Sequence, residues 1–175
     1  MSKHDDESGA HPRFIVERIA GNVQLSPRLP PVHNLAASAV GALIGSAFQL
    51  SAPGGWIVLY TPEIHLGDDI VVPDVAAWKQ SRLQLGFDAD YFTLPPDWVV
   101  EVLAPKTADM DRAKLPVYAA AGVGHAWLVD PRSQSLEVLR REGMGWQTLA
   151  THRGTAQVRA EPFEALTFDL DVLWC

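Results

Sequence analysis

The sequence predicts an α/β (α+β) fold in which a mixed β-sheet is flanked by helices. The apolar patterns follow the order helix, three strands, helix and then further strands, which is typical of a sheet with helices on its faces. The segment Trp98–Leu103 (WVVEVL) is apolar on both faces, as a central strand is. With 175 residues, 47% apolar and 20% charged, the chain has the size and composition of one globular domain.

The first elements are predicted to be two short strands around a turn at Gly21-Asn22, followed by a helix. The helix is expected over residues 32–50, because apolar residues recur there at steps of three and four. Gly41 and Gly45 lie inside it as a GxxxG pair. Since the stretch is judged too short to span a membrane, the pair indicates a buried helix that another element approaches closely.

The pattern then changes to that of strands, and the expected strands are 56–60, 64–66 and 70–78. The last two are expected to form a hairpin, and Pro62 and Pro73 are expected to mark edges or bulges. Residues 79–96 are predicted to form a long loop, a length that usually indicates a functional or mobile segment.

A second helix is expected from Thr107 or Asp109 to Ala121, and Gly122 ends it. Pro116 lies inside this helix, so either its first turn is irregular or its regular part begins near Lys114. The remaining elements are expected to be a three-stranded meander and a short closing segment, over 125–129, 135–140, 146–152 and 162–174.

The charge balance excludes some classes of function. Fourteen Lys and Arg residues stand against 21 Asp and Glu residues, a net charge of −7, which is the wrong sign for nonspecific coating of nucleic acid. The single cysteine, Cys175, favours a reducing, cytoplasmic location. Residues 1–12 are polar and are expected to form a disordered tail before a single domain over 13–175. No membrane association is expected, because no apolar run reaches the length of a span.

Two carboxylates are the first candidates for chemistry. Asp74 (IVVPDVAAW) and Glu101 (WVVEVLAP) each lie in an apolar strand context, where a carboxylate is costly unless it is paired or bound to a metal. On neighbouring strands the two could hold one hard cation such as Mg²⁺. The alternative is a pair of structural carboxylates that are ion-paired or hydrogen-bonded.

A lysine on the following helix is the third candidate. Asp111, Lys114 and Tyr118 are three and four positions apart, so they share one helical face. Lys114 could orient an attacking water and stabilise developing negative charge. The alternative is a surface pair between Asp111 and Lys114, and Lys106 competes as the active lysine.

Two further residues remain open. Glu63 could point into the same cleft as Asp74 or could face solvent from an edge strand. His33, near the start of the first helix, is expected to be a capping or core residue rather than a ligand. The six histidines show no zinc spacing, and the chain has no P-loop, GxGxxG or GxSxG motif.

The run PDWVVEVLAPKTADMDRAKLPVYAAAGVGHAWLVDP, with WIVLYTPEIHLGDDIVVPD and VPDVAAW before it, resembles the Uma-type restriction endonuclease family. That family belongs to the PD-(D/E)XK nuclease superfamily, and the resemblance extends from Phe14 to Trp174. It implies a restriction-endonuclease-like fold and an endonuclease that depends on Mg²⁺, with Mn²⁺ as a substitute. It also implies that Asp74 and Glu101 bind the metal and that the carbonyl of Val102 completes the shell.

The chain departs from the superfamily motif at the lysine. The resemblance places that lysine two residues after the glutamate, where this sequence has Leu103. It implies that the lysine has moved to the next helix, where Lys114 lies, and that Glu63 matches an acidic position on the family's hairpin.

The favoured function is therefore hydrolysis of DNA by a homodimer, since cutting both strands of a duplex favours two sites. An alternative is a catalytically weak or inactive member that uses the fold as a binding or assembly module; Leu103 and the acidic net charge support it. A third hypothesis, a structural protein without metal, predicts that Asp74 and Glu101 both pair with Arg or Lys.

Overall fold

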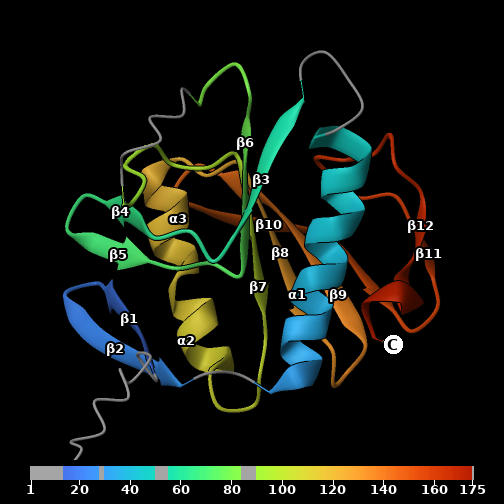
Figure 1. The fold of residues 1–175 in the computed structure, drawn as a ribbon, viewed down its shortest axis with the longest axis horizontal. Coiled ribbons are helices and arrows are strands. Elements are labelled where there is room, and N and C mark those ends of the chain that lie inside the picture. The colour runs from blue at the N-terminus through green and yellow to red at the C-terminus, as the bar shows by residue number, and fades with distance from the viewer. Residues whose placement is uncertain (1–13, 28–29, 50–54, 84–89, 175) are drawn as a thin grey trace, which may run out of the picture.

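The chain folds around a six-stranded mixed sheet with helices on both faces, which confirms the predicted fold class (Figure 1). The computed structural model describes residues 14–27, 30–49, 55–83 and 90–174. The sheet has the order β10-β9-β8-β7-β6-β3. In chain order its strands are β3 (Trp56–Tyr60), β6 (Val75–Lys79), β7 (Trp98–Val102), β8 (His125–Asp130), β9 (Ser135–Glu142) and β10 (Gly145–Arg153).

Strand β7 is the central strand that the sequence predicts, and all five of its residues are buried. It pairs antiparallel with β6 and parallel with β8, and the helical crossover between β7 and β8 covers one face of the sheet. Side chains alternate along a strand, so Val100 packs into the core beneath the first helix while Val99 packs under the crossover. Glu101 shares the face of Val99 and therefore points toward the crossover.

The prediction of one strand over residues 70–78 is wrong, because this segment forms two strands that belong to different sheets. β5 (Asp69–Val71) belongs to a four-stranded sheet, and β6 begins only at Val75. Pro73, which has no N–H to donate to a ladder, lies between them. The small sheet has the order β2-β1-β5-β4, and its other strands are β1 (Phe14–Ile19), β2 (Asn22–Pro27) and β4 (Ile64–Leu66).

Helix α1 (Pro31–Ile44) continues as the π-helical turn η1 (Gly45–Gln49) and packs on the face of the sheet opposite the crossover (Figure 1). The stretch Pro31–Gln49 has 19 residues and meets the length and composition of a membrane span, so the expectation that it is too short is wrong. Its inward side chains, Ala36, Val40 and Ile44, pack against the sheet, as those of a core helix do.

The expected close approach of another element to this helix is confirmed at Gly41. A Cβ there would overlap the ring of Tyr60, which lies on β3. At Gly45 a Cβ would meet only the side-chain oxygen of Gln49, at 3.8 Å, so among the described residues no strand or second helix comes within 4 Å there.

The crossover consists of two short helices, α2 (Ala108–Ala113) and α3 (Leu115–Ala121), which meet at Lys114. Pro116 explains the break, since it cannot donate a hydrogen bond to the preceding turn and its ring would clash with the carbonyl of Arg112. The predicted irregularity is thus confirmed. Gly122, at a φ of 91°, ends α3 in the left-handed region.

The C-terminal meander is confirmed, with strands slightly longer than predicted. The closing segment contains β11 (Gln157–Val158), β12 (Phe168–Asp169) and the short 3₁₀ turn η2 (Leu170–Leu173). Phe92, near the end of the predicted long loop, forms an isolated bridge with Ile64 on β4. The predicted tail, residues 1–12, lies outside the described residues.

The contact between Gly41 and Tyr60 is testable by a double-mutant cycle. Gly41→Ala should be neutral or destabilising alone, because the tyrosine ring must move and this offsets the roughly 1 kcal/mol gained in helix propensity. In a Tyr60→Ala background the same change should raise the free energy of unfolding by about 0.5–1 kcal/mol. Urea denaturation of the four proteins measures the coupling, and additive effects would contradict this packing.

Candidate active site

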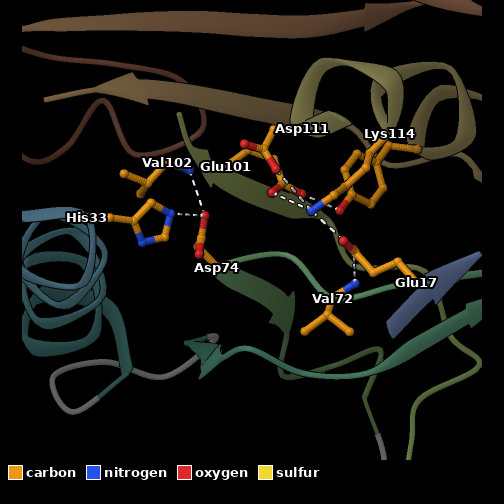
Figure 2. A network of polar contacts seen from close by, with 9 residues as sticks. Glu17, His33, Val72, Asp74, Glu101, Val102, Asp111 and Lys114 are labelled. Carbon is orange, nitrogen blue, oxygen red and sulfur yellow. Dashed lines mark hydrogen bonds and ion pairs between the residues drawn. The ribbon is translucent and has the colours of Figure 1, made fainter. Parts of the chain in front are cut away.

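A network of polar side chains lies where β6 begins and β7 ends (Figure 2). Its members come from both sheets and from the helices on both faces. They are Glu17 on β1, His33 on α1, Asp74 before β6, Glu101 on β7, and Asp111, Lys114 and Tyr118 of the crossover.

Lys114 is at the centre of this network. Its Nζ lies 2.9 Å from Oε2 of Glu101, 3.1 Å from Oε1 of Glu17 and 3.5 Å from Oδ1 of Asp111. The lysine is only 3% exposed, so the alternative of a surface pair with Asp111 is wrong. The break between α2 and α3 places Lys114 at the turn that faces the end of β7.

Glu101 has both carboxylate oxygens engaged. Oε2 accepts from Lys114, and Oε1 accepts a hydrogen bond of 2.5 Å from the Tyr118 hydroxyl. Burial raises the pKa of Glu101 well above its ordinary value; Lys114 opposes the rise, and the charge of Asp74 adds to it. Asp74 and Glu101 are therefore electrostatically coupled.

The lysine remains charged because three carboxylates surround it. Burial lowers the pKa of Lys114, but Glu101, Glu17 and Asp111 outweigh that effect and raise it above its ordinary value. Burial raises the pKa of Asp111 to about 6, with Lys114 acting in the opposite direction. Oδ2 of Asp111 and the Thr107 hydroxyl oxygen are buried and have no hydrogen-bond partner among the described residues.

Glu17 is the member that the sequence analysis missed. Its Oε1 accepts the N–H of Val72 at 2.8 Å as well as contacting Lys114, and the residue is 3% exposed. The available signal was its place on β1, where Glu17 and Ile19 alternate as buried residues of one strand face. A charged residue on an inward strand face needs a partner, and here that partner is far away in the sequence.

Asp74 lies in the connection just before β6, and not within a strand as predicted. β6 follows it directly and pairs with β7 through Val75 and Val100. Oδ2 of Asp74 accepts the N–H of Val102 at 2.7 Å. The N–H of the next residue, Leu103, donates to the carbonyl of Val129 on β8. Because these groups alternate along a strand, the N–H and C=O of Val102 face the opposite edge of β7, where Asp74 lies.

His33 is a buried residue, which is one of the two roles expected for it. It lies in the first turn of α1, yet it makes no capping bond, because that helix has no side-chain cap. It is 3% exposed, and its Nε2 lies 3.3 Å from Oδ2 of Asp74 (Figure 2). Burial lowers the pKa of His33, but contact with the Asp74 carboxylate outweighs this and raises it.

The structure does not bring Glu63 or Lys106 into the network. The Glu63 carboxylate pairs with His65 on β4 at 2.7 Å and is about half exposed. Lys106 is exposed at the start of the crossover. Lys114, and not Lys106, is therefore the lysine that contacts Glu101.

The residues present fit a metal site with few protein ligands. No three His, Cys, Asp or Glu side chains converge on a metal position within the described part of the chain. Mg²⁺ needs only one or two carboxylates, with waters and substrate phosphate in the rest of its shell. Asp74 is partly exposed, at 16% of its side chain, and could serve as one of these ligands.

The third hypothesis from the sequence holds for only one of the two acids. Glu101 pairs with a lysine, as a structural carboxylate would. The charged partner described for Asp74 is His33, rather than a lysine or arginine. The two carboxylates therefore differ in their charged partners: Glu101 contacts a lysine, and Asp74 contacts a histidine.

Comparison with known proteins supports a nuclease fold. The model of the Uma2 family, described as "Putative restriction endonuclease", matches residues 6–172. A crystal structure described as "a putative nuclease belonging to DUF820", from Anabaena variabilis, superposes with a TM-score of 0.77. The two chains are 23% identical, over 91% of this chain and 89% of the other. No curated protein matches the chain.

The buried lysine is tested by Lys114→Met. The change leaves three carboxylates without their cation, so we expect a loss of about 3–5 kcal/mol in the free energy of unfolding at pH 7.5. The loss should shrink at pH 5.5, because the folded variant takes up protons on these carboxylates. Lys106→Met, at an exposed position, should stay within about 0.5 kcal/mol of the wild type. A deficit that does not depend on pH would contradict this account.

Asp111→Asn tests the raised pKa. A carboxyl whose pKa rises from 3.8 to about 6 on folding binds more protons in the folded state over that range. Asp111 therefore lowers stability as pH rises from 4 to 7, and the full shift corresponds to about 3 kcal/mol. Between pH 4 and pH 8, denaturation curves should show the free energy of unfolding of the variant rising by about 3 kcal/mol relative to that of the wild type. Parallel profiles would contradict the assignment.

Proposed function

Because the chain belongs to the Uma2 family, whose model is described as "Putative restriction endonuclease", we propose that it is a Mg²⁺-dependent endonuclease that hydrolyses DNA. The observation that carries the proposal is the buried Lys114, bonded to a strand carboxylate, Glu101, that is coupled to the Asp74 carboxylate. Glu101 lies on a regular strand, and strand positions hold catalytic groups more rigidly than loops do.

Asp74, Glu101 and the carbonyl of Val102 would hold the Mg²⁺ ion. When bound, the ion would act as a Lewis acid that stabilises charge on the phosphoryl oxygens. Lys114 is proposed to orient the attacking water and to stabilise negative charge as it develops. Glu17 and Asp111 keep that ammonium charged, and the Tyr118 hydroxyl holds the second oxygen of Glu101.

A second candidate function is a catalytically weak or inactive nuclease-fold protein that acts as a binding or assembly module. The specific observation in its favour is that both oxygens of Glu101 are already engaged, one by Lys114 and one by Tyr118. The net charge of −7 also disfavours tight nonspecific binding of DNA. On this hypothesis the network would serve stability rather than turnover.

The proposal further assigns this protein a cytoplasmic location and DNA as its substrate. It includes a homodimer, in which two copies of the site could cut the two strands of a duplex. The choice of DNA rests on the family's description, the location on the single cysteine, and the dimer on the two strands of a duplex.

A cleavage assay with matched variants tests the proposal. Wild-type protein should cut DNA with Mg²⁺ or Mn²⁺ and stop when a chelator is added. Asp74→Asn and Glu101→Gln keep the shape of each side chain but remove its charge, and each should lower the cleavage rate at least about 100-fold. Lys79→Ala, at an exposed position on β6, is the matched control and should cut at the wild-type rate.

Two outcomes of this assay would overturn the proposal or part of it. If Lys106→Ala abolishes cleavage, the assignment of the lysine to Lys114 is wrong. If folded wild-type protein binds Mg²⁺ without cutting any DNA form tested, the module hypothesis replaces the nuclease.

A further inference from the structure

His33 is a buried side chain of the network whose ring nitrogens make no aligned hydrogen bond among the described residues, although Nε2 lies 3.3 Å from the Asp74 carboxylate. The residue is 3% exposed, and both Nδ1 and Nε2 are buried without a hydrogen-bond partner in the described part of the chain. A buried polar atom in a native protein is normally satisfied by protein, water or an ion. Beside Asp74, the imidazole therefore has hydrogen-bonding capacity left for a water or an ion.

The other two histidine–carboxylate pairs of the described chain show that this is specific to His33. His65 contacts Glu63 at 2.7 Å and His125 contacts Glu161 at 3.0 Å, and both contacts are hydrogen bonds. His33 lies 3.3 Å from Asp74 and is not aligned for one. Oδ2 of Asp74 instead accepts the N–H of Val102.

The separation of these two atoms suits a shared cation. Ligand atoms about 2.1 Å from a six-coordinate ion lie about 3 Å apart when they are neighbours in the shell. Nε2 of His33 and Oδ2 of Asp74 approach that separation, and they come from different elements, α1 and the connection before β6. Two side chains suffice for an open site, which agrees with the lack of a three-side-chain cage among the described residues.

We propose that His33 is a direct ligand of the cation at this site, beside Asp74, and that its imidazole makes the site prefer a transition ion such as Mn²⁺ over Mg²⁺. The inference rests on the proposed function, because it takes Asp74 to be a metal ligand. Imidazole suits first-row transition ions, whereas Mg²⁺ prefers oxygen ligands and keeps its waters. Ion preference would thus depend on α1, an element outside the acidic strand motif.

The experiment measures binding rather than turnover. The whole protein is titrated with Mn²⁺ and separately with Mg²⁺, by calorimetry, for wild type, His33→Gln, Asp74→Asn and His65→Gln. The last variant is the matched control, since His65 is also a histidine paired with a carboxylate. Electron spin-echo spectroscopy of Mn²⁺-loaded wild type then reports whether an imidazole nitrogen is bonded directly to the ion, and this readout needs no variant.

The proposal expects a nitrogen hyperfine coupling in wild type and His65→Gln that His33→Gln loses. Mn²⁺ affinity should fall at least about tenfold in His33→Gln, with a smaller change for Mg²⁺. If Mn²⁺ binds and depends on Asp74 but shows no nitrogen coupling, His33 is not a ligand, although the proposed metal site stands. If wild type binds neither ion, this inference and the metal dependence of the proposed function both fail.

Discussion

The contact between Lys114 and its three carboxylates is the constraint on which the arrangement of this site depends. A charge taken out of water is stable only when opposite charges and hydrogen bonds surround it. Lys114 meets that condition with Glu17 from the small sheet, Glu101 from the central strand and Asp111 from its own crossover. The pairing therefore ties the small sheet to the large one at the position where α2 and α3 meet.

The second constraint is the passage of the chain between the two sheets. Pro73 ends the small sheet's ladder and leaves Asp74 at the start of β6 rather than inside a strand. From there Asp74 reaches the main chain of β7 on one side and His33 of α1 on the other. An aspartate within a regular strand would point to one face only. Its place at a crossing lets one carboxylate connect the central strand β7 with the helix α1.

Local patterns in the sequence were sufficient to predict the part of the site whose residues lie close together along the chain. The doubly apolar run around Glu101 predicted a central strand, which the structure confirms. The spacing of Asp111, Lys114 and Tyr118 predicted one helical face; the structure brings the three side chains together, but on two helices that meet at Lys114. Pro116 correctly indicated an irregular start to that helix. Periodicity within an element carries such information, because it reports which residues share a face.

The same patterns could not predict which distant elements meet. Glu17 joins the network because β1 lies beside Lys114 of the crossover, and His33 because α1 packs on β6 and β7. A pattern within one element does not encode that packing. The prediction of one continuous strand over 70–78 was wrong for a related reason. Apolar residues continue across Pro73 in the sequence, but the segments before and after it belong to different sheets. Tertiary packing decided both cases, overriding local propensity.

The balance of charge in the network bears on what can bind there. Three carboxylates contact one lysine, and Asp74 adds to the negative potential at Glu101. Proton uptake relieves part of that excess below neutral pH, where the raised pKa of Asp111, about 6, allows it to protonate. A phosphodiester carries negative charge of its own and would be repelled by the remainder. For a nuclease built on this network, a cation must therefore separate the carboxylates from the phosphate, so that metal binding and DNA binding at the site are coupled rather than independent.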